Sequence, residues 1–242
     1  MIAAAGVVVP AHNEADLLPA CLAAARLAAG ALAPVPVHLV VVADACHDQT
    51  AVLARAAGAT VLEIGARRVG AARAAGMREV LRHTAHLDPG EVWLASTDAD
   101  TVVPPCWLAR QLRYAAAGWD AVVGTVTVAD WTEHPPDVPP RFLASYLADA
   151  TGHPHVHGAN LGFTAAAYQA VGGFPALRTG EDRALVLSLQ ASGFGVLRSA
   201  AVSVITSARV RYRAPAGFGH DLATLNDGGG PLLGLRGGAA GV

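Results

Sequence analysis

Short runs of apolar, mostly β-branched residues alternate with helical periodicity through the first half of the chain. The apolar runs lie at residues 6–9, 37–42, 60–64 and 92–96, and the helical patterns at 14–29, 48–57, 70–83 and 107–117. Strands that alternate with helices build a largely parallel sheet with helices on both faces. The pattern therefore predicts an α/β fold, in which the loops after the strands meet at one edge of the sheet, where ligands bind.

The length and composition favour one globular domain. The chain has 242 residues, of which 53% are hydrophobic and 15% charged, and this is enough to bury a sizeable core. After residue 120 the regular alternation ends, but no linker separates the two halves. We therefore expect a single domain at 1–225, made of halves 1–118 and 119–225, and a Gly-rich flexible tail at 226–242.

Several classes of protein are excluded by composition. All 17 basic residues are arginines, which excludes a P-loop and Schiff-base chemistry because both need a lysine. Three scattered cysteines favour reduced thiols, and no leader-like segment opens the chain, so we expect a cytoplasmic protein. The net charge of −2 gives no reason to expect a nucleic acid partner, and no apolar run is long enough for a transmembrane segment.

Asp98 and Asp100 directly follow the predicted strand at 92–96. Two carboxylates at the end of a strand offer hard oxygen ligands to a divalent cation. Mg²⁺ or Mn²⁺ held in this way keeps its other positions for water and substrate phosphates. The pattern indicates an enzyme that handles a diphosphate, and an Asp-capped turn is the alternative interpretation.

Four motifs occur in a fixed order along the chain. They are VPAHNE at 9–14, ADACHDQT at 43–50, DAD at 98–100 and GED at 180–182. Together they resemble glycosyltransferase family 2, the nucleotide-sugar transferases with a GT-A fold, over roughly residues 5–222. The resemblance implies a single GT-A type domain with a mostly parallel central sheet. Residues 1–118 would form its Rossmann-like nucleotide-sugar half and residues 119–225 its acceptor half.

The resemblance implies roles on the donor side of the site. Pro10, Ala11 and Glu14 would line the base and ribose pocket, with a helix cap as the alternative for Glu14. Asp44 would accept a hydrogen bond from the base, although the family commonly has a second acid where this chain has Ala43. A carboxylate accepts from uracil and from guanine alike, so the donor is of the UDP or GDP type.

Three further residues are assigned near the diphosphate by the same resemblance. Arg73, in a run of small residues at 70–76, matches a basic position near the nucleotide, and a solvated helix face is the alternative. The small residues would let this helix lie close to the donor. Asp98 would approach the ribose, and Asp100 would bind the metal, Mg²⁺ or Mn²⁺.

The resemblance places the general base at the second acid of the last motif, which is Asp182. Asp182 would take the proton of the acceptor hydroxyl as that oxygen attacks the anomeric carbon opposite the leaving group, so the reaction would invert the sugar. Glu181 would orient the acceptor or Arg183. Two acids favoured by the dipole of a helix N-terminus are the alternative.

The acceptor side rests on a histidine-rich segment. His153, His155 and His157 alternate and would share one face of a strand, a spacing that suits a transition metal. The segment continues, however, into residues 158–163, which resemble the acceptor-side strand of the family. In that interpretation His157 and Asn160 would touch the sugar or the acceptor.

Arg209, Arg211 and Arg213 alternate near the end of the domain. Like charges on one face call for an anion, so a diphosphate or an acidic acceptor is one interpretation, and a solvated edge strand is the other. The resemblance implies a segment that folds over the diphosphate, with Arg213 as its contact. His220 would complete the metal shell.

These observations predict transfer of a sugar from a UDP- or GDP-sugar to a hydroxyl acceptor, with inversion and a divalent metal. The acceptor stays open between lipid-linked and small-metabolite types, and so does peripheral contact with the inner face of a membrane. One alternative is a nucleotidyltransferase, which would carry a Gly-rich basic loop where this chain has residues 10–14. The other is a catalytically degenerate nucleotide-binding module, which Ala43 favours and the intact acids oppose.

Overall fold

A computed structural model describes residues 1–146, 152–210 and 218–226. Its strands are β1 (Ala4–Ala11), β2 (Val37–Asp44), β3 (Thr60–Ile64), β4 (Val92–Ser96), β5 (Thr101–Val102), β6 (Ala121–Val128), β7 (Leu161–Thr164) and β8 (Val196–Thr206). Its α-helices are α1 (Leu18–Gly30), α2 (Thr50–Ala56), α3 (Val69–His83), α4 (Trp107–Ala116), α5 (Val138–Ser145), α6 (Ala165–Ala170), α7 (Glu181–Ala191) and α8 (Phe218–Asn226), with 3₁₀ turns η1 (Pro89–Glu91) and η2 (Gly158–Asn160).

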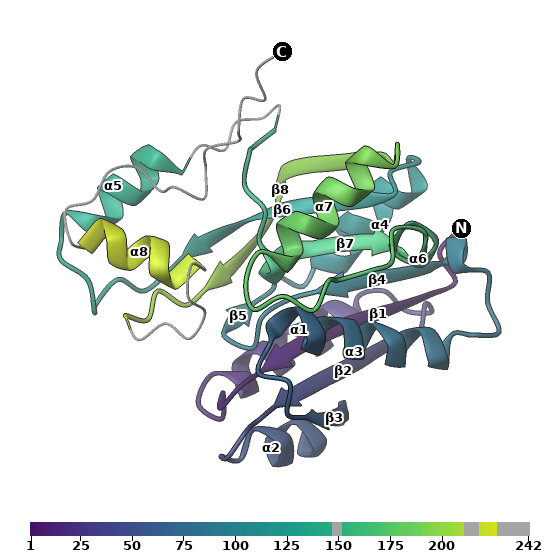
Figure 1. The fold of residues 1–242 in the computed structure, drawn as a ribbon, viewed down its shortest axis with the longest axis horizontal. Coiled ribbons are helices and arrows are strands. Elements are labelled where there is room, and N and C mark those ends of the chain that lie inside the picture. Colours follow the sequence, from purple (N-terminus) through teal and green to yellow (C-terminus); the bar gives the residue numbers. More distant parts are fainter. Residues whose placement is uncertain (147–151, 211–217, 227–242) are drawn as a thin grey trace.

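One sheet runs through the molecule in the order β3-β2-β1-β4-β7-β6-β8-β5 (Figure 1). The first four strands are mutually parallel, which confirms the predicted α/β fold. The antiparallel β7 then joins β4 to β6, and β6 is parallel to β8. The two halves of the chain therefore share a single sheet, and β5 from the first half lies at its far edge, paired with β8 from the second.

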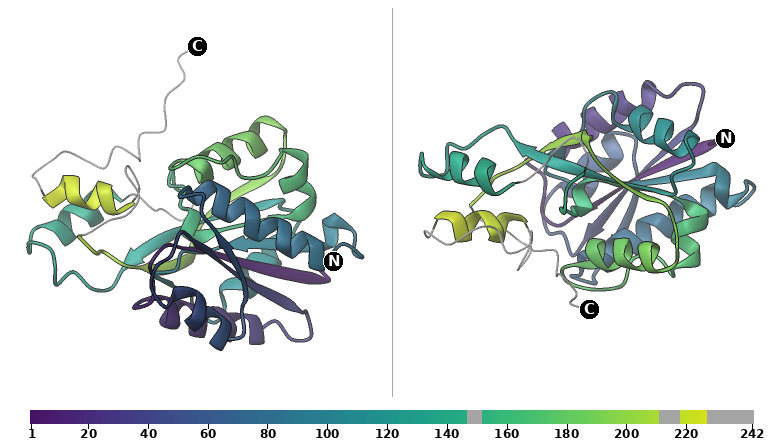
Figure 2. Two further views of the ribbon diagram at one scale, coloured as in Figure 1. Left: turned by 60° about the horizontal axis from the view of Figure 1, so that its bottom comes forward. Right: turned by 90° about the horizontal axis from the view of Figure 1, so that it is seen from above.

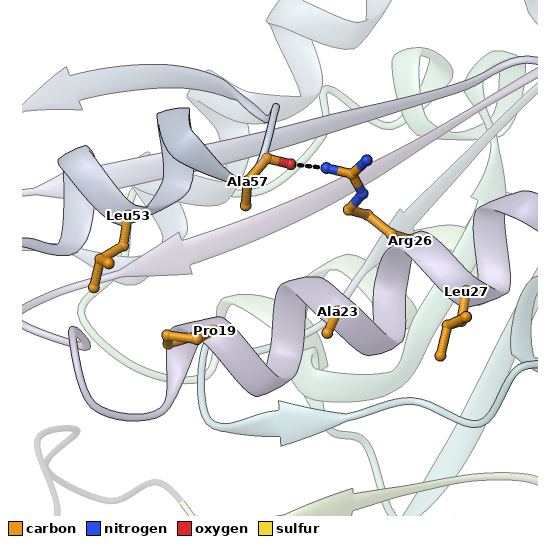
Figure 3. A pocket seen from close by; sticks show the side chains of 6 residues that line it. All are labelled: Pro19, Ala23, Arg26, Leu27, Leu53 and Ala57. Atoms are coloured by element: carbon orange, nitrogen blue, oxygen red, sulfur yellow. Dashed lines mark hydrogen bonds between the residues drawn. The ribbon is translucent and has the colours of Figure 1, made fainter.

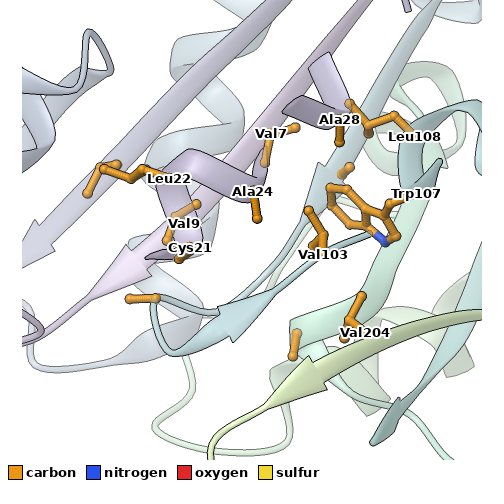
Figure 4. Close-up of a cluster of buried hydrophobic side chains, with 14 of the residues drawn as sticks. Val7, Val9, Cys21, Leu22, Ala24, Ala28, Val103, Trp107, Leu108 and Val204 are labelled. Carbon is orange, nitrogen blue, oxygen red and sulfur yellow. The ribbon is translucent and has the colours of Figure 1, made fainter. Parts of the chain in front are cut away.

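Helices cover both faces of this sheet, and the strand period of two decides which residue faces which layer. On β1, Val7 and Val9 face a core formed with α1 and α4, whereas Val8 faces the core under α3, α6 and α7. Trp107 is fully buried in the first core (Figure 4). Gly76 of α3 leaves no room for a Cβ against Val8, so α3 lies close on β1.

The helices α5 and α8 stand apart from the main body (Figure 2). They form a small core of their own from Val138, Phe142, Leu222 and Leu225. Helix α5 contains prolines in its first turn, where a helix tolerates them. Of the predicted tail, only Asn226, the last residue of α8, lies within the described residues.

Strand β8 runs from Val196 to Thr206, with a register shift opposite Gly124 and Thr125. One expectation for the second half differs from the structure. The histidines at 153, 155 and 157 precede η2 and do not lie on a strand. Within the described ranges, none of the helices combines the length and apolar character needed to cross a bilayer.

Candidate active site

Five carboxylates from distant parts of the chain gather at the carboxyl ends of β1 and β4. Glu14 follows β1, Asp98 and Asp100 follow β4, and Glu181 and Asp182 open α7. The ends of β1 and β4 meet because these strands are parallel neighbours. The charges of Glu14 and Asp182 both act on Asp98, so the acids of the first, third and fourth motifs share one site.

Arg73 binds two of these five carboxylates, those of Asp98 and Glu181. Its Nη2 donates to Asp98 Oδ1 over 2.8 Å, and its Nε donates to Glu181 Oε1 over 3.0 Å. Its Nη1 also donates to Ser96 Oγ over 3.2 Å. Arg73 is only 3% exposed, so the alternative of a solvated helix face does not hold. The guanidinium is a buried cross-link between β4 and α7.

Glu181 binds Arg73 instead of the predicted Arg183 or an acceptor. Its side chain is buried beside Arg73, Asp98 and Asp182. Burial raises the pKa of Glu181 to about 7, the Arg73 guanidinium opposes this, and Asp182 adds to it. Glu181 is therefore a structural partner of Arg73, and its carboxyl group keeps its proton up to a pH of about 7.

The Asp98 and Asp100 carboxylates also have raised pKa values. Removal from water is the main cause for both, and it raises the pKa of Asp100 to about 6. The positive charge of Arg73 opposes the shift at Asp98, and that of Arg209 opposes it at Asp100. The Asp98 side chain nevertheless keeps 35% of its surface exposed. Part of this carboxylate is therefore accessible to solvent.

Arg209 closes the outer side of the acid group. Its Nη1 and Nη2 donate to the two carboxylate oxygens of Glu14, each over 2.8 Å, and Nη2 also lies 2.8 Å from Asp100 Oδ2. Glu14 thus forms an ion pair with Arg209. From the sequence, only a place in the base and ribose pocket or a helix cap is predicted for this residue. The alternating arginines predict an anionic partner. For Arg209 the anions are the carboxylates of Glu14 and Asp100, and no local sequence pattern identifies them.

Asp182 stands at the first turn of α7 and is held by backbone amides. Its Oδ2 accepts from the N–H of Gly158 and its Oδ1 from the N–H of Arg183, both over 2.7 Å. Each oxygen keeps a second lone pair. The carboxylate is thus oriented, and it can still accept a proton.

The three histidines form a ladder of rings. His155 stacks on Tyr146 with ring centroids 3.9 Å apart, and His153 and His157 flank His155 at 5.7 and 6.0 Å. The Tyr146 hydroxyl lies 3.0 Å from His157 Nε2. Burial lowers the pKa of His157 to about 3, so its ring is neutral. Parallel rings do not converge on one metal ion, and the ladder packs beside the segment that holds Asp182.

Asn160 does not reach the site surface. It is fully buried, its Nδ2 donates to the carbonyls of Thr125 and Val202, and its Oδ1 accepts from Trp107 Nε1. The predicted contact with the acceptor is therefore corrected: Asn160 ties η2 to β6, β8 and α4. An asparagine in a Gly-Ala-Asn turn resembles a surface residue, and only the tertiary structure reveals its burial.

Asp44 is committed to the backbone of the loop before α3. Its Oδ1 accepts from the N–H of Arg67 over 2.8 Å, and its Oδ2 accepts from the N–H of Arg68 over 3.0 Å. Arg67 has a φ of 51°, so these bonds hold a left-handed turn. Its role toward the base stays a prediction, as do those of Pro10 and Ala11, which are buried at the end of β1.

The start of α3 does not face open space. A Cβ at Gly70 would lie 2.1 Å from the carbonyl oxygen of Pro175, so the small residue admits the segment before α7 and not the donor. His220 is exposed on α8, and its metal role stays a prediction. Arg211 and Arg213 lie outside the described residues.

The Asp98 and Asp100 carboxylates fit Mg²⁺ or Mn²⁺. Both are hard oxygen donors, one bound by Arg73 and the other by Arg209 through a single oxygen, so each has an oxygen to offer. Among residues 1–146, 152–210 and 218–226, no set of three or more His, Cys, Asp or Glu side chains is arranged around a metal position. A Mg²⁺ or Mn²⁺ ion held by one or two carboxylates takes its other ligands from water and phosphate.

Two hollows lie on the surface. One of about 620 Å³ between α1 and α2 is lined by Pro19, Ala23, Leu27 and Leu53, with Arg26 donating to the Ala57 carbonyl (Figure 3). It holds none of the acids. The other, of about 280 Å³, is lined in part by Asp100 and Arg209 and opens beside the site.

Comparisons with known proteins concern the family and the fold of this chain. The family model described as Glycosyl transferase family 2 matches residues 6–171. A comparison with curated protein sequences finds no match. Solved structures similar to this one include the mannosyltransferase PcManGT from Pyrobaculum calidifontis in complex with GDP-Man and Mn²⁺, at 21% identity and a TM-score of 0.64, with 87% of this chain and 59% of that chain covered.

Two further structures share the fold. TarS from S. aureus has 14% identity and a TM-score of 0.60, over 85% of this chain and 60% of that one. Glucosyl-3-phosphoglycerate synthase from Mycobacterium tuberculosis, in complex with Mn²⁺, UDP and glucosyl-3-phosphoglycerate, has 15% identity and a TM-score of 0.52, over 91% of this chain and 76% of that one. This chain spans about 60% of the length of the first two structures.

Proposed function

Because the chain belongs to glycosyl transferase family 2, we propose that it transfers a sugar from a UDP- or GDP-sugar to a hydroxyl acceptor, with inversion and with the help of Mg²⁺ or Mn²⁺. The observation that carries the proposal is the Arg73 cross-link, because its contacts to Asp98 and Glu181 bring the β4 acids next to Asp182. The neighbours crystallised with GDP-Man and with UDP support both donor types.

We assign the donor to the nucleotide half, 1–118, and the acceptor to the half at 119–225. Pro10, Ala11, Asp44 and Glu14 would face the base and ribose, Asp98 would approach the ribose, and Asp100 would hold the cation. When bound, the cation supplies positive charge that stabilises the departing nucleoside diphosphate. Arg73 keeps Asp98 in place beneath this position and, being buried, does not itself reach the donor.

Asp182 is the proposed general base. The proton of the acceptor hydroxyl moves to an Asp182 oxygen, the hydroxyl oxygen forms a bond to the anomeric carbon, and the bond from that carbon to the diphosphate oxygen breaks. The N–H groups of Gly158 and Arg183 hold the carboxylate for this step. The acceptor is a hydroxyl compound, lipid-linked or small. Because 76% of the synthase complexed with glucosyl-3-phosphoglycerate is covered, that neighbour favours a small acceptor for a first screen.

The test is Asp182→Asn, assayed for release of UDP or GDP from nucleotide sugars with a panel of acceptors. Because a positioned base contributes about 10²–10⁴-fold, we expect kcat to fall by that factor while nucleotide binding, measured by calorimetry, stays within about twofold. Asp137→Asn is the matched control, since this exposed acid lies outside the site and pairs only weakly with Arg141. Unchanged kcat in Asp182→Asn would refute the assignment.

A nucleotidyltransferase would release diphosphate from a nucleoside triphosphate instead. The same assay with triphosphates and sugar phosphates separates the two reactions, and a degenerate binding module would turn over neither. Asp98, Asp100 and Asp182 are all intact in this chain, which opposes the degenerate module, and residues 10–14 form no Gly-rich basic loop, which opposes the nucleotidyltransferase.

A further inference from the structure

We propose that Arg209 is an exchangeable counter-cation: it holds Glu14 and Asp100 together through its guanidinium, and it competes with the divalent cation for Asp100 until a nucleoside diphosphate arrives. The inference rests on the proposed function, since it takes Asp100 as the cation ligand. It adds that metal and nucleotide bind cooperatively because of one residue.

The first step is the position of Arg209. Its guanidinium lies 2.8 Å from Asp100 Oδ2 and grips Glu14 with both terminal nitrogens. A cation bound to the Asp100 carboxylate would stand about 2 Å from one of its oxygens. It would therefore lie within a few ångströms of the guanidinium, and the two positive charges would repel each other.

The second step is the balance of charge. Glu14, Asp98, Asp100, Glu181 and Asp182 face two guanidiniums, those of Arg73 and Arg209. Arg73 cannot leave, because it is 3% exposed and bonded on three sides. Arg209 has a side chain that is 24% exposed. Of these two arginines, only Arg209 is free to give way to a cation or to turn toward an anion.

The third step is the short connection that carries Arg209. Strand β8 is fixed beside Asp100, because Thr206 pairs with Thr101 and their hydroxyls hydrogen-bond over 3.0 Å. Beyond it, the Arg209 N–H donates to Ser207 Oγ and the Val210 N–H to Glu133 Oε2. In the part of the chain that the structure describes, both of these backbone N–H groups donate to side-chain oxygens and not to a strand partner.

From these steps we derive a coupling. A cation alone must displace Arg209 from Asp100, and the guanidinium then keeps Glu14 but loses one of its two carboxylate partners. A nucleoside diphosphate that enters with the cation offers phosphate oxygens, which a guanidinium binds well. Each ligand therefore raises the affinity for the other by the same factor, and couplings of this kind are typically about 5–150-fold.

The experiment measures Mn²⁺ binding to the full chain by the electron paramagnetic resonance signal of free Mn²⁺, alone and with saturating UDP or GDP. We expect the unmodified protein to bind Mn²⁺ about tenfold or more tightly when the right nucleotide is present. Arg209→Gln without nucleotide should already bind Mn²⁺ about tenfold more tightly than the unmodified protein, and nucleotide should then raise the affinity by a smaller factor than it does in the unmodified protein.

Two controls frame this result. Arg209→Lys keeps the charge and should stay close to the unmodified protein. Arg110→Gln removes an arginine that donates to the Ala201 carbonyl on an exposed surface, and it should change nothing. Arg209→Met repeats the neutral substitution, and circular dichroism checks that each variant is folded.

The outcomes separate the two proposals. If the unmodified protein binds Mn²⁺ with nucleotide but folded Arg209→Gln and Arg209→Met bind it alone no more tightly than the unmodified protein, the counter-cation role is wrong and the cation site stands. If none of the proteins binds Mn²⁺ with UDP or GDP, the cation site itself is wrong, and the role of Arg209 is overturned with it.

Discussion

Two arginines neutralise the acids of this site, one from the inside and one from the outside. Arg73 comes from the buried face of α3 and is bonded to Ser96, Asp98 and Glu181. Arg209 comes from the connection after β8 and reaches Glu14 and Asp100 across the mouth. The same side chain is thus a fixed part of the scaffold in one place and a removable partner in the other, and burial makes the difference.

The strongest way to break this contrast is Arg73→Gln. Removing one partner from a buried ion pair leaves uncompensated charge and typically costs 3–5 kcal/mol. Protonation of Glu181 relieves part of this cost, so we expect a loss of about 3 kcal/mol in the free energy of unfolding, measured by urea denaturation at pH 7. Arg110→Gln should stay within about 0.5 kcal/mol. A loss below about 1 kcal/mol for Arg73→Gln would show that the inner pair is not structural.

The buried pair of Arg73 and Glu181 also predicts that the free energy of unfolding depends on pH. Glu181 has a pKa raised from 4.5 to about 7, so the folded chain binds this proton more tightly than the unfolded chain. The stability contributed by the group is complete below pH 4.5 and is lost as the pH rises through about 7.

We expect the free energy of unfolding to fall between pH 5 and pH 8 by about 2 kcal/mol more in the unmodified protein than in Glu181→Gln. Urea denaturation at the two pH values measures this difference. Asp100, with a pKa raised to about 6, adds a change of the same sign in both proteins. Equal pH dependence in the two proteins would remove Glu181 from this explanation.

The smallest expected effect is on stability in Arg209→Gln. This pair is partly open to water, and such pairs contribute up to about 1 kcal/mol. Thermal melting at pH 7 with a chelator should therefore show a loss near that value, well below the loss for Arg73→Gln. A loss as large as that of Arg73→Gln would show that both arginines belong to the scaffold.

The same contrast explains what the sequence predicts and what it does not. The strands of the first half and the acids at their ends are local patterns: an apolar run that stops at Asp98 marks both a strand and its exposed end. The partner of Glu14 is 195 residues away, and no local pattern connects the two. The two-residue β5 and the buried amide of Asn160 are likewise tertiary features.

The position of β5 has a consequence for how the protein is made. The chain leaves the centre of the sheet after Asp98, forms β5, and meets its pairing partner Thr206 only after about a hundred more residues have been added. On the ribosome, the amino-terminal strands emerge early, whereas the edge beside Asp100 stays unpaired until β8 has been translated. A nascent chain that stops before this point holds the motif acids but not the enclosure in which they act.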